Sequence, residues 1–494
     1  MTSHYLCALG FSAKAVRWLL PVILLSVSLG ASFAAPSSGL LVYPYPRAVK
    51  YHAGDVMRDP YHNDDFTVRV RVPGGTWQSL YTHNVKVDWD NPQNASMVYF
   101  DFTGKVEVAI EKNNGTFSKV RIRPNGKGIK PVVKAGIVSF VLDRPQNLSV
   151  EFDGDTLHNL HLFAGDASIA AKRPPDGPNL VYFGPGVHKP DAGADSFVLS
   201  SGQTAFIDGG AVLEGSFLLD NVHDVSIIGH GLIENPKTAL IVKNSHNIHV
   251  EGLIVANPAP RMRALNCIQS QHVDVSDMKS FSSTANGDGI NVFSCEDVKL
   301  DHLFFRNSDD CIAIYTIRDD AVAADVRRIA VTNSIFWADV AHAMFVGING
   351  NPDKPQTIED VVFRNIDVLD MDEDQPDFQG VMAVSAGDAN LVRNVSFEDI
   401  RVDHIQSGRL FNFAVVQNKK YNKIPGRGIE NLTVRNVTYT GYGMPSPSIV
   451  RGYDDAHRIR HVRIENVRIG GQKMTGAQQD VVEIGAYADD VAFR

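Results

Sequence analysis

The stretch Ile248-His-Val-Glu-Gly-Leu253 returns along the chain as Val273-Asp-Val-Ser-Asp-Met278 and as Val298-Lys-Leu-Asp-His-Leu303. In each copy apolar and polar residues alternate over a short run that ends in a polar bend. Five further copies place the equivalent residues at positions 250, 275, 300, 331, 363, 397, 434 and 464. Because units made only of strand and turn bury a continuous apolar interior by stacking, the repeat predicts a right-handed parallel β-helix.

The steps between copies grow from 25 residues to 37 residues, and no helical period runs through them. Propeller blades are antiparallel and about 40 residues long, and a leucine-rich repeat needs a Leu/Asn consensus, so neither fold fits. The bends are often Asn or Asp, which tolerate a left-handed backbone. The longer steps after residue 300 predict loops on one edge of the later coils, where such loops usually build a groove wall.

The residues before the repeat have the pattern of an antiparallel β domain. Runs such as Phe66–Val72 and Met97–Phe102 alternate apolar and polar residues, and turn sequences such as Pro73-Gly-Gly75 separate them. Short strands with one apolar face predict a β-sandwich. We therefore expect an all-β chain with an antiparallel β-sandwich over residues 36–180 and the parallel β-helix over residues 181–494, joined near Lys172–Pro178.

The first residues read as a targeting segment. Lys14 and Arg17 precede an apolar run, Leu19–Leu29, and Ser32-Phe-Ala34 offers a small-x-small cleavage site. This pattern predicts a signal peptide over residues 1–34 and a secreted or periplasmic protein. An uncleaved membrane anchor is the alternative, but the run is short for a span of about 20 residues.

Charge and cysteine content exclude several classes of protein. The formal net charge is -9, and it becomes -11 once the leader is removed. An acidic chain without basic runs argues against nucleic acid or an anionic membrane as a partner. Three cysteines remain after the leader, Cys267, Cys295 and Cys311, and they have neither a disulfide framework nor zinc spacing. We expect buried thiols.

Two neighbouring copies carry acids where the repeat would accept any polar residue. They read Asn286-Gly-Asp-Gly-Ile-Asn-Val292 and Asn307-Ser-Asp-Asp-Cys-Ile-Ala-Ile314. When the first isoleucines of the two copies are aligned, Asp288 falls over Asp310, about one coil away, and Asp309 lies beside them. Crowded carboxylates resist simultaneous ionisation, so we expect at least one raised pKa. A protonated acid beside ionised ones is the arrangement that cleaves glycosidic bonds.

The next coil adds a histidine to this column. In Ala341–Gly347, aligning Met344 with Ile312 brings His342 near Asp310. A cation there would hold a carboxylate ionised or orient a substrate.

Other interpretations of these residues stay open. A calcium site is the main alternative for the three aspartates, and an Asp-Asp pair alone is usually a solvated turn. The acidic stretch Asp370–Asp377 is expected to form a loop at the groove rim rather than a metal cage. Asn418–Asn422 would contact sugar through Tyr421 or form a plain exposed turn.

The chain resembles glycoside hydrolase family 28, the polygalacturonases, over roughly residues 200 to 470. The family pattern Asn-Thr-Asp-Gly appears as Asn286–Gly289 with Gly for Thr, and Asp-Asp-Cys-Ile-Ala-Ile appears unchanged as Asp309–Ile314. Gly-His-Gly appears as Ala341-His-Ala343. The β-sandwich ahead of the helix is similar to that of family 49, whose members cut α-linked glucans such as dextran.

The resemblance implies a role for each matched residue. Asp309 would be the general acid, Asp288 and Asp310 would activate the attacking water with inversion at the anomeric carbon, and His342 would support them. The resemblance implies no cofactor and no metal. We expect substrate contacts from a further group of side chains: Asn286, Asn307, Tyr315, Gln379, Lys420 and Tyr421.

One family element is missing. Where family 28 has Arg-Ile-Lys, which binds a galacturonate carboxylate by charge-assisted bonds, this chain reads Gly380–Gly387. We therefore expect a neutral α-linked glycan as substrate. A uronic-acid glycan remains the alternative, with Lys419, Lys420 or Arg427 as the replacement cation. A polysaccharide lyase and a non-catalytic carbohydrate-binding β-helix are the rival classes.

Overall fold

The computed structural model describes residues 39–47, 60–234, 236, 238–256, 263–317, 322–478 and 480–494. The predicted signal peptide, residues 1–34, lies outside the described residues. Residues 38–494 form one compact unit. Helical structure in the described residues is confined to two short 3-10 turns, η1 (Asn125–Lys127) and η2 (Ala167–Lys172). No helix among these residues is long and apolar enough to cross a membrane.

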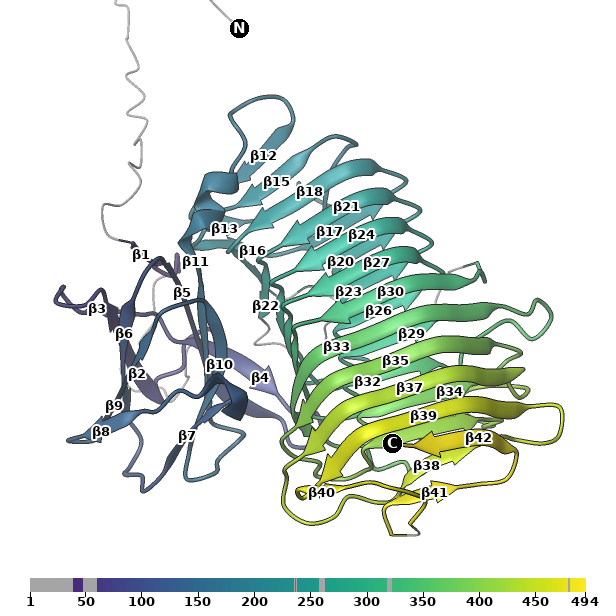
Figure 1. Cartoon of the computed structure of the whole chain (residues 1–494). Helices are drawn as coiled ribbons and strands as arrows, with labels where there is room; N and C mark the ends of the chain where they lie inside the picture. The colour runs from purple at the N-terminus through teal and green to yellow at the C-terminus, as the bar shows by residue number, and fades with distance from the viewer. Residues whose placement is uncertain are drawn as a thin grey trace, which may run out of the picture. The chain divides into compact units, whose positions relative to one another are not determined.

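Two sheets form the amino-terminal region (Figure 1). The first has the order β1-β5-β11-β10-β7, with β4 also paired to β5: β1 (Leu40–Val42), β4 (His83–Val87), β5 (Gln93–Phe102), β7 (Val120–Arg123), β10 (Gln146–Phe152) and β11 (Leu160–Asp166). The second has the order β3-β2-β6-β9-β8: β2 (Phe66–Arg71), β3 (Gln78–Ser79), β6 (Val106–Lys112), β8 (Val132–Lys134) and β9 (Ile137–Leu142). Alternate side chains of both sheets share one buried core that includes Val68, Phe100 and Val150.

One pair in this region departs from the expected antiparallel pattern. Strand β11 forms a hairpin with β10 and also lies beside β5, to which it is parallel. Alternation along a strand predicts which side chains are buried but not the direction of the neighbouring strand, so the sequence carried no signal for this pairing.

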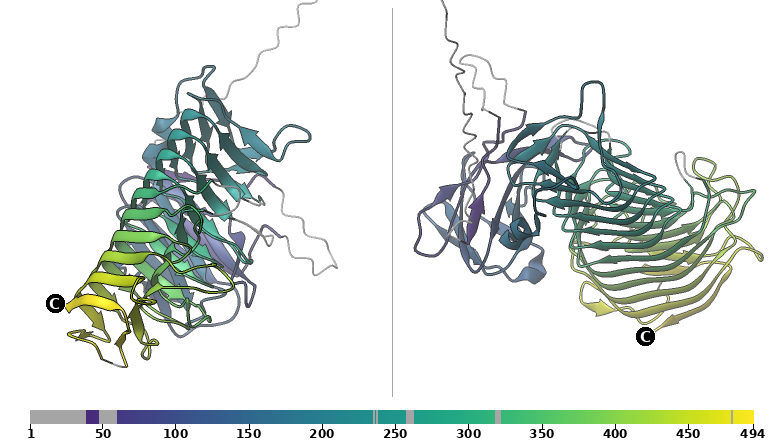
Figure 2. Two further views of the ribbon diagram at one scale, coloured as in Figure 1. Left: turned by 90° about the vertical axis from the view of Figure 1, so that its right-hand side faces the viewer. Right: turned by 90° about the horizontal axis from the view of Figure 1, so that it is seen from above.

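From Leu180 onward the chain winds into stacked parallel coils, which form two large sheets (Figures 1 and 2). The 20-stranded sheet contains β12 (Leu180–Phe183), β13 (Gly186–His188), β15 (Thr204–Ile207), β16 (Ala211–Leu213), β18 (His223–Gly229), β19 (Leu232–Glu234), β21 (His246–Glu251), β22 (Ile254–Ala256), β24 (Gln271–Ser276), β25 (Lys279–Phe281), β27 (Glu296–Asp301), β28 (Phe304–Asn307), β30 (Val326–Thr332), β31 (Ile335–Ala338), β33 (Thr357–Met371), β35 (Leu391–Val402), β37 (Gly428–Tyr439), β39 (Arg458–Ile469), β40 (Gln472–Lys473) and β42 (Ala488–Phe493).

The 11-stranded sheet faces it across the core and carries the predicted site. Its strands follow the chain order: β14 (Ser196–Val198), β17 (Ser216–Asp220), β20 (Thr238–Lys243), β23 (Arg263–Ile268), β26 (Ile290–Phe293), β29 (Ile312–Tyr315), β32 (Met344–Gly347), β34 (Met382–Ala386), β36 (Phe411–Val415), β38 (Ser448–Arg451) and β41 (Val482–Ile484). The fold is therefore a parallel β-helix preceded by a β-sandwich, as expected. The division at residues 180 and 181 stays our proposal for the domain boundary.

The repeat positions identified in the sequence pair with one another from coil to coil and so define the register of the stack. Val250 pairs with Val275 and Val275 with Leu300. The same column continues through Val331, Phe363, Phe397, Val434 and Ile464. All eight side chains are buried in one continuous core. Apolar residues one coil apart therefore stack directly on one another, which is what fixes the register of parallel coils.

The polar bends also behave as the sequence predicts. Asn333, Asn365, Asp399, Asn436 and Asn466 end successive copies with φ between 50° and 58°. Their side chains bond from coil to coil: Asn365 Nδ2 donates to Asn333 Oδ1 over 2.7 Å, and Asn466 Nδ2 donates to Asn436 Oδ1 over 2.9 Å. Asn and Asp fit these corners because their short side chains tolerate and support a left-handed backbone.

Candidate active site

The coils stack so that the predicted aspartates and histidine share one column. Ile290 of β26 pairs with Ile312 of β29, and Ile312 pairs with Met344 of β32. This is the alignment expected from the sequence. The turns that lead into these three strands carry Asp288, the Asp309–Asp310 pair and His342.

The three aspartates lie together. One carboxylate oxygen from each of Asp288, Asp309 and Asp310 lies within 4.8 Å of the other two. Asp288 and Asp310 are buried, whereas Asp309 is half-buried. Within the described part of the chain, this is the cluster of acidic, histidine or cysteine side chains whose spacing would also suit a metal ion. The three carboxylates are therefore close enough together for acid–base cleavage of a bond. Their spacing alone would also suit a bound cation.

Asp288 is held by a cation and an amide. Arg263 Nε lies 3.0 Å from Asp288 Oδ2, and Asn291 Nδ2 donates to the same oxygen over 3.0 Å. Arg263 Nε also donates to Asn286 O over 3.3 Å. Sequence reasoning did not identify Arg263, although a signal was present. Leu265 pairs with Ile290, so the alignment that joined the aspartates, taken one coil back, brings Arg263 over Asp288.

Asp310 is held by His342 and Tyr315. His342 Nδ1 donates to Asp310 Oδ1 over 2.7 Å, and Tyr315 Oη donates to Asp310 Oδ2 over 2.9 Å. His342 Nε2 bonds to the carbonyl oxygen of Phe378. Since both partners of the imidazole are acceptors, both ring nitrogens must carry protons, and His342 is a cation in this arrangement.

The electrostatics of His342 agree with its hydrogen bonds. Burial lowers the pKa of His342, but the charge of Asp310 and the bond to it outweigh burial and raise that pKa to about 9. His342 is therefore charged at neutral pH, and its ion pair with Asp310 fixes the direction of both side chains.

Asp309 is oriented by the backbone. Its Oδ2 accepts the Asn286 N–H over 3.0 Å and its Oδ1 accepts the Asp310 N–H over 3.0 Å. Asn286 takes a φ of 57°, which turns its N–H toward the carboxylate of the next coil. Of the three acids, Asp309 is the one whose side chain reaches the surface, as a group that meets a large substrate must.

Lys420 and Tyr421, predicted to contact substrate, sit on the loop between β36 and β37. Lys420 Nζ and Tyr421 Oη both donate to Gln375 Oε1, over 3.2 Å and 2.9 Å. The Tyr421 ring meets the Phe378 ring edge to face at 4.7 Å. Because the Phe378 carbonyl accepts from His342, this group borders the aspartate cluster. The predicted rim loop, which contains Gln375, is thus tied to the site.

Three of the other predicted substrate contacts are not exposed as expected. Asn307 is fully buried, and its Nδ2 donates to Ser282 Oγ over 3.0 Å and to Gly287 O over 3.2 Å. Tyr315 is buried beneath Asp310, and the buried Gln379 accepts from Arg409 Nη2 over 3.0 Å. These buried side chains support the turns of the site by hydrogen bonds. Packing between coils, rather than the polarity of a residue, decides whether a turn side chain points inward. Asn286 is exposed beside Asp309.

The chain is similar to known carbohydrate-cleaving enzymes in both sequence and fold. The sequence profile described as Glycosyl hydrolases family 28 matches residues 183–485, more than half of the chain. The chain belongs to glycosyl hydrolases family 28. This family 28 chain is therefore a glycoside hydrolase. No curated protein sequence matches it.

Among solved structures, Dex49A from Penicillium minioluteum is similar to the family 28 chain with a TM-score of 0.62 at 13% identity, covering 93% of this chain and 99% of that one. The family 28 exopolygalacturonase from Yersinia enterocolitica gives a TM-score of 0.48 at 12% identity, covering 83% and 98%. The catalytic domain of a GH87 α-1,3-glucanase in complex with nigerose gives 0.38 at 12% identity, covering 87% and 85%. The first of these likenesses extends the fold assignment over both regions of the chain.

Proposed function

We propose that the protein is an exported, inverting glycoside hydrolase that cleaves a neutral α-linked polysaccharide or oligosaccharide. The observation that carries the proposal is the meeting of Asp288, Asp309 and Asp310 within 4.8 Å on adjacent coils. Export rests on the leader pattern of residues 1–34. The sugar is the partner we propose, and the chemistry needs no cofactor.

The three acids differ in their neighbours and in their exposure, because Asp309 alone reaches the surface. The guanidinium of Arg263 lies beside Asp288, and the imidazolium of His342 lies beside Asp310. Asp309, half-buried, is oriented by two backbone N–H groups. We assign Asp309 as the acid that protonates the glycosidic oxygen while the C–O bond breaks. Asp288 and Asp310 orient the attacking water and take its proton.

The spacing bears on stereochemistry. Most inverting enzymes separate acid and base by about 6.5–9.5 Å, which leaves room for water between them. Here the closest oxygens of the three acids lie within 4.8 Å. For inversion at this spacing, we place the attacking water beside the Asp288–Asp310 pair and the sugar across all three acids. The anomer released first, read by proton NMR, tests this: an α product from an α-linked substrate would overturn inversion.

A neutral substrate is supported by the coil where family 28 has its basic pair. Strand β34 lies there, and all five of its residues, Met382–Ala386, are buried. None of these five residues is a cation that could bind a sugar carboxylate. The likeness to Dex49A, a dextranase of family 49, extends over nearly the whole chain and favours a glucan among neutral glycans.

A uronic-acid glycan is the second candidate, and one observation favours it. The exposed Lys420 shares Gln375 Oε1 with Tyr421, and the Tyr421 ring packs on Phe378, whose carbonyl oxygen accepts from His342. Arg427 does not serve, because its guanidinium bonds to Ala389 O and Gln356 O. Lys420 is therefore the candidate for a carboxylate contact.

Reducing-end release tests both candidates. Wild type and Asp309→Asn are compared on dextran, pullulan and polygalacturonate with a chelator present, and Asp454→Asn, a surface acid, is the matched control. We expect release from a neutral glycan that Asp309→Asn lowers by about 10²–10⁴-fold. Release from polygalacturonate alone would favour the second candidate. Loss of activity with chelator and an ultraviolet-absorbing product would indicate a lyase, and equal rates in wild type and Asp309→Asn would exclude the assigned acid.

A further inference from the structure

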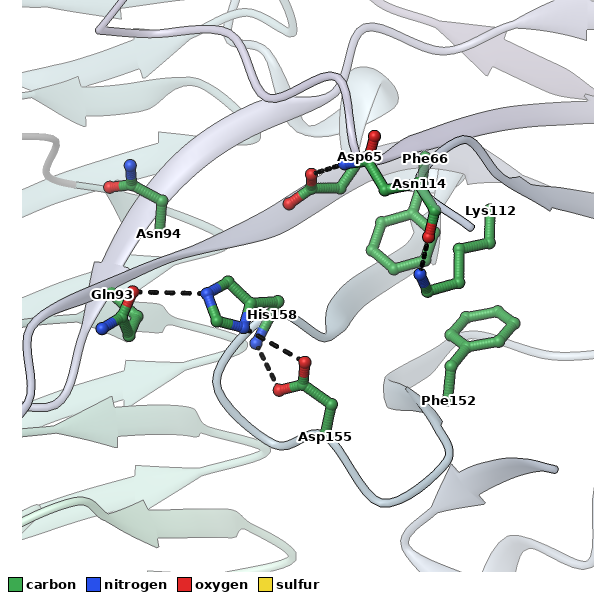
Figure 3. A pocket seen from close by; sticks show the side chains of 9 residues that line it. All are labelled: Asp65, Phe66, Gln93, Asn94, Lys112, Asn114, Phe152, Asp155 and His158. Atoms are coloured by element: carbon green, nitrogen blue, oxygen red, sulfur yellow. Dashed lines mark hydrogen bonds and ion pairs between the residues drawn. The ribbon is translucent and has the colours of Figure 1, made fainter. Parts of the chain in front are cut away.

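A second polar pocket lies at one end of the amino-terminal sandwich, apart from the aspartate cluster. Its volume is about 360 Å³, within the range that small-molecule sites occupy. Both sheets contribute to it, through the ends of strands β2, β5, β6 and β10 and through the loop after β10 (Figure 3). An opening between the ends of two packed sheets is a place where sandwich domains present ligand-binding loops.

The inner wall is aromatic. Phe66 and Phe152 line the pocket, each 3% exposed, and their rings stack at 5.3 Å between centroids. Both belong to the sandwich core, so the wall is rigid. Because so little of either ring is exposed, the two rings form a rigid floor beneath the polar groups of the pocket.

One side of the pocket is a chain of fixed polar groups. Asp155 accepts the backbone N–H groups of Leu157 and His158, each over 2.9 Å. His158 Nδ1 bonds to Asp155 Oδ2 over 3.1 Å and His158 Nε2 to Gln93 Oε1 over 3.3 Å (Figure 3). The imidazole is thus oriented from both sides before any ligand arrives, which lowers the entropic cost of binding.

The opposite side supplies a carboxylate, an amide and an ammonium group. Asn114 Nδ2 donates to Asp65 Oδ1, and Lys112 Nζ donates to Asn114 O (Figure 3). The pocket therefore presents donors and acceptors on two facing walls, with the aromatic surface between them.

The charges of the lining exclude several ligand classes. Two carboxylates, Asp65 and Asp155, face one ammonium group, Lys112, so the lining disfavours phosphate, sulfate or uronate. The many polar groups disfavour an apolar ligand. Neither carboxylate belongs to a group with metal-ligand spacing among the described residues. A neutral polyhydroxyl ligand fits, because each hydroxyl both donates and accepts.

We propose that this pocket binds a neutral sugar unit and is an accessory glycan-binding site of the enzyme. Its volume of about 360 Å³ corresponds to about a dozen waters, which leaves room for one sugar unit. The site would hold a glycan chain to the protein without cleaving it. The proposal goes beyond the hydrolase assignment and does not depend on which linkage the aspartates cut.

A local readout separates binding in this pocket from binding at the aspartate cluster. In the full chain carrying Asp309→Asn and labelled with 13C-histidine, the His158 signal is assigned by its loss in His158→Gln. Isomaltotriose should move that signal in a saturable way at millimolar concentration, and inorganic phosphate should not. His461, which bonds to Asp490 elsewhere, is the internal control. No movement through about 10 mM saccharide, or equal movement with phosphate, overturns the proposal.

A variant pair supplies an independent measurement. Gln93→Ala removes the amide that orients His158, and Gln472→Ala, on exposed strand β40, is the matched control. Retardation of each protein in a native gel that contains dextran should weaken about fivefold in Gln93→Ala only, with turnover of a short soluble substrate unchanged. Equal retardation overturns the proposal. If the hydrolase assignment is wrong, wild type will show no turnover of the glycans, but saccharide will still shift the His158 signal.

Discussion

Arg263 Nε lies 3.0 Å from Asp288 Oδ2, across one step of the β-helix. The contact follows from the pairing of Leu265 with Ile290, which stacks the two turns ahead of those residues. Asp288 is fully buried. Because burying a carboxylate without a cation and hydrogen-bond donors is costly, we expect Arg263 to control the protonation of Asp288.

Replacing Arg263 should therefore change the pH dependence of catalysis as well as its rate. In Arg263→Gln we expect the pKa of Asp288 to rise, so that the acid limb of kcat/KM moves to higher pH and the rate falls about 10- to 100-fold at neutral pH. Arg263→Lys should recover part of both effects. Arg435→Gln, which removes a half-exposed ion pair with Glu398, is the control. A lower rate with an unmoved profile would mean that Arg263 acts on something other than Asp288.

His342 should make the protein sensitive to alkaline pH. Its folded-state pKa is raised to about 9, above the ordinary value of 6.5. The imidazolium–Asp310 pair therefore contributes its full stability below pH 6.5 and loses it as pH rises to about 9. We expect Tm and activity to fall together across this window in wild type, and the fall in Tm to shrink in His342→Gln. The exposed pair His461–Asp490 gives the control, His461→Gln. Identical Tm–pH curves for wild type and His342→Gln would refute the assignment.

Lys420 offers a direct test of substrate charge. With a neutral substrate, Lys420→Ala should change kcat/KM by less than about threefold, since one exposed hydrogen bond is worth little. With a uronic-acid substrate the same change should raise KM more than about tenfold, because a charge-assisted bond is lost. Lys130→Ala, an exposed lysine in the amino-terminal sandwich, is the control. A large effect on a neutral glycan alone would assign Lys420 to the binding of a hydroxyl group.

Asn307 should matter for stability and, through it, for the turn that carries Asp288. Its buried Nδ2 holds Ser282 Oγ and Gly287 O, so Asn307→Ala leaves polar groups of that turn unsatisfied. We expect a loss of about 1–3 kcal/mol in the free energy of unfolding, measured with urea, together with a lower kcat. Asn431→Ala, which removes an exposed bond to Asn394, should cost less than about 0.5 kcal/mol. Wild-type stability in Asn307→Ala would show that the turn does not depend on this amide.

The sequence was a reliable guide wherever a repeated apolar pattern carried the information. The column from Val250 to Ile464 and the stacking of Ile290, Ile312 and Met344 were all predicted, because stacked coils must superpose their buried residues. The meeting of the three aspartates followed from that superposition. The parallel pairing of β5 with β11 was missed, since non-repeating strands give no such constraint.

What the sequence by itself determined is the period of the β-helix, its register and the column that brings Asp288, Asp309, Asp310 and His342 together. What only the tertiary structure decided is the direction and burial of the side chains in the turns. Asn307, Tyr315 and Gln379 were predicted to contact substrate, and their side chains are buried, whereas Arg263 was not predicted and pairs with Asp288. The physical reason is that strand periodicity fixes side-chain direction every second residue. A turn has no such period, so contacts with distant coils and loops set the orientation of its side chains.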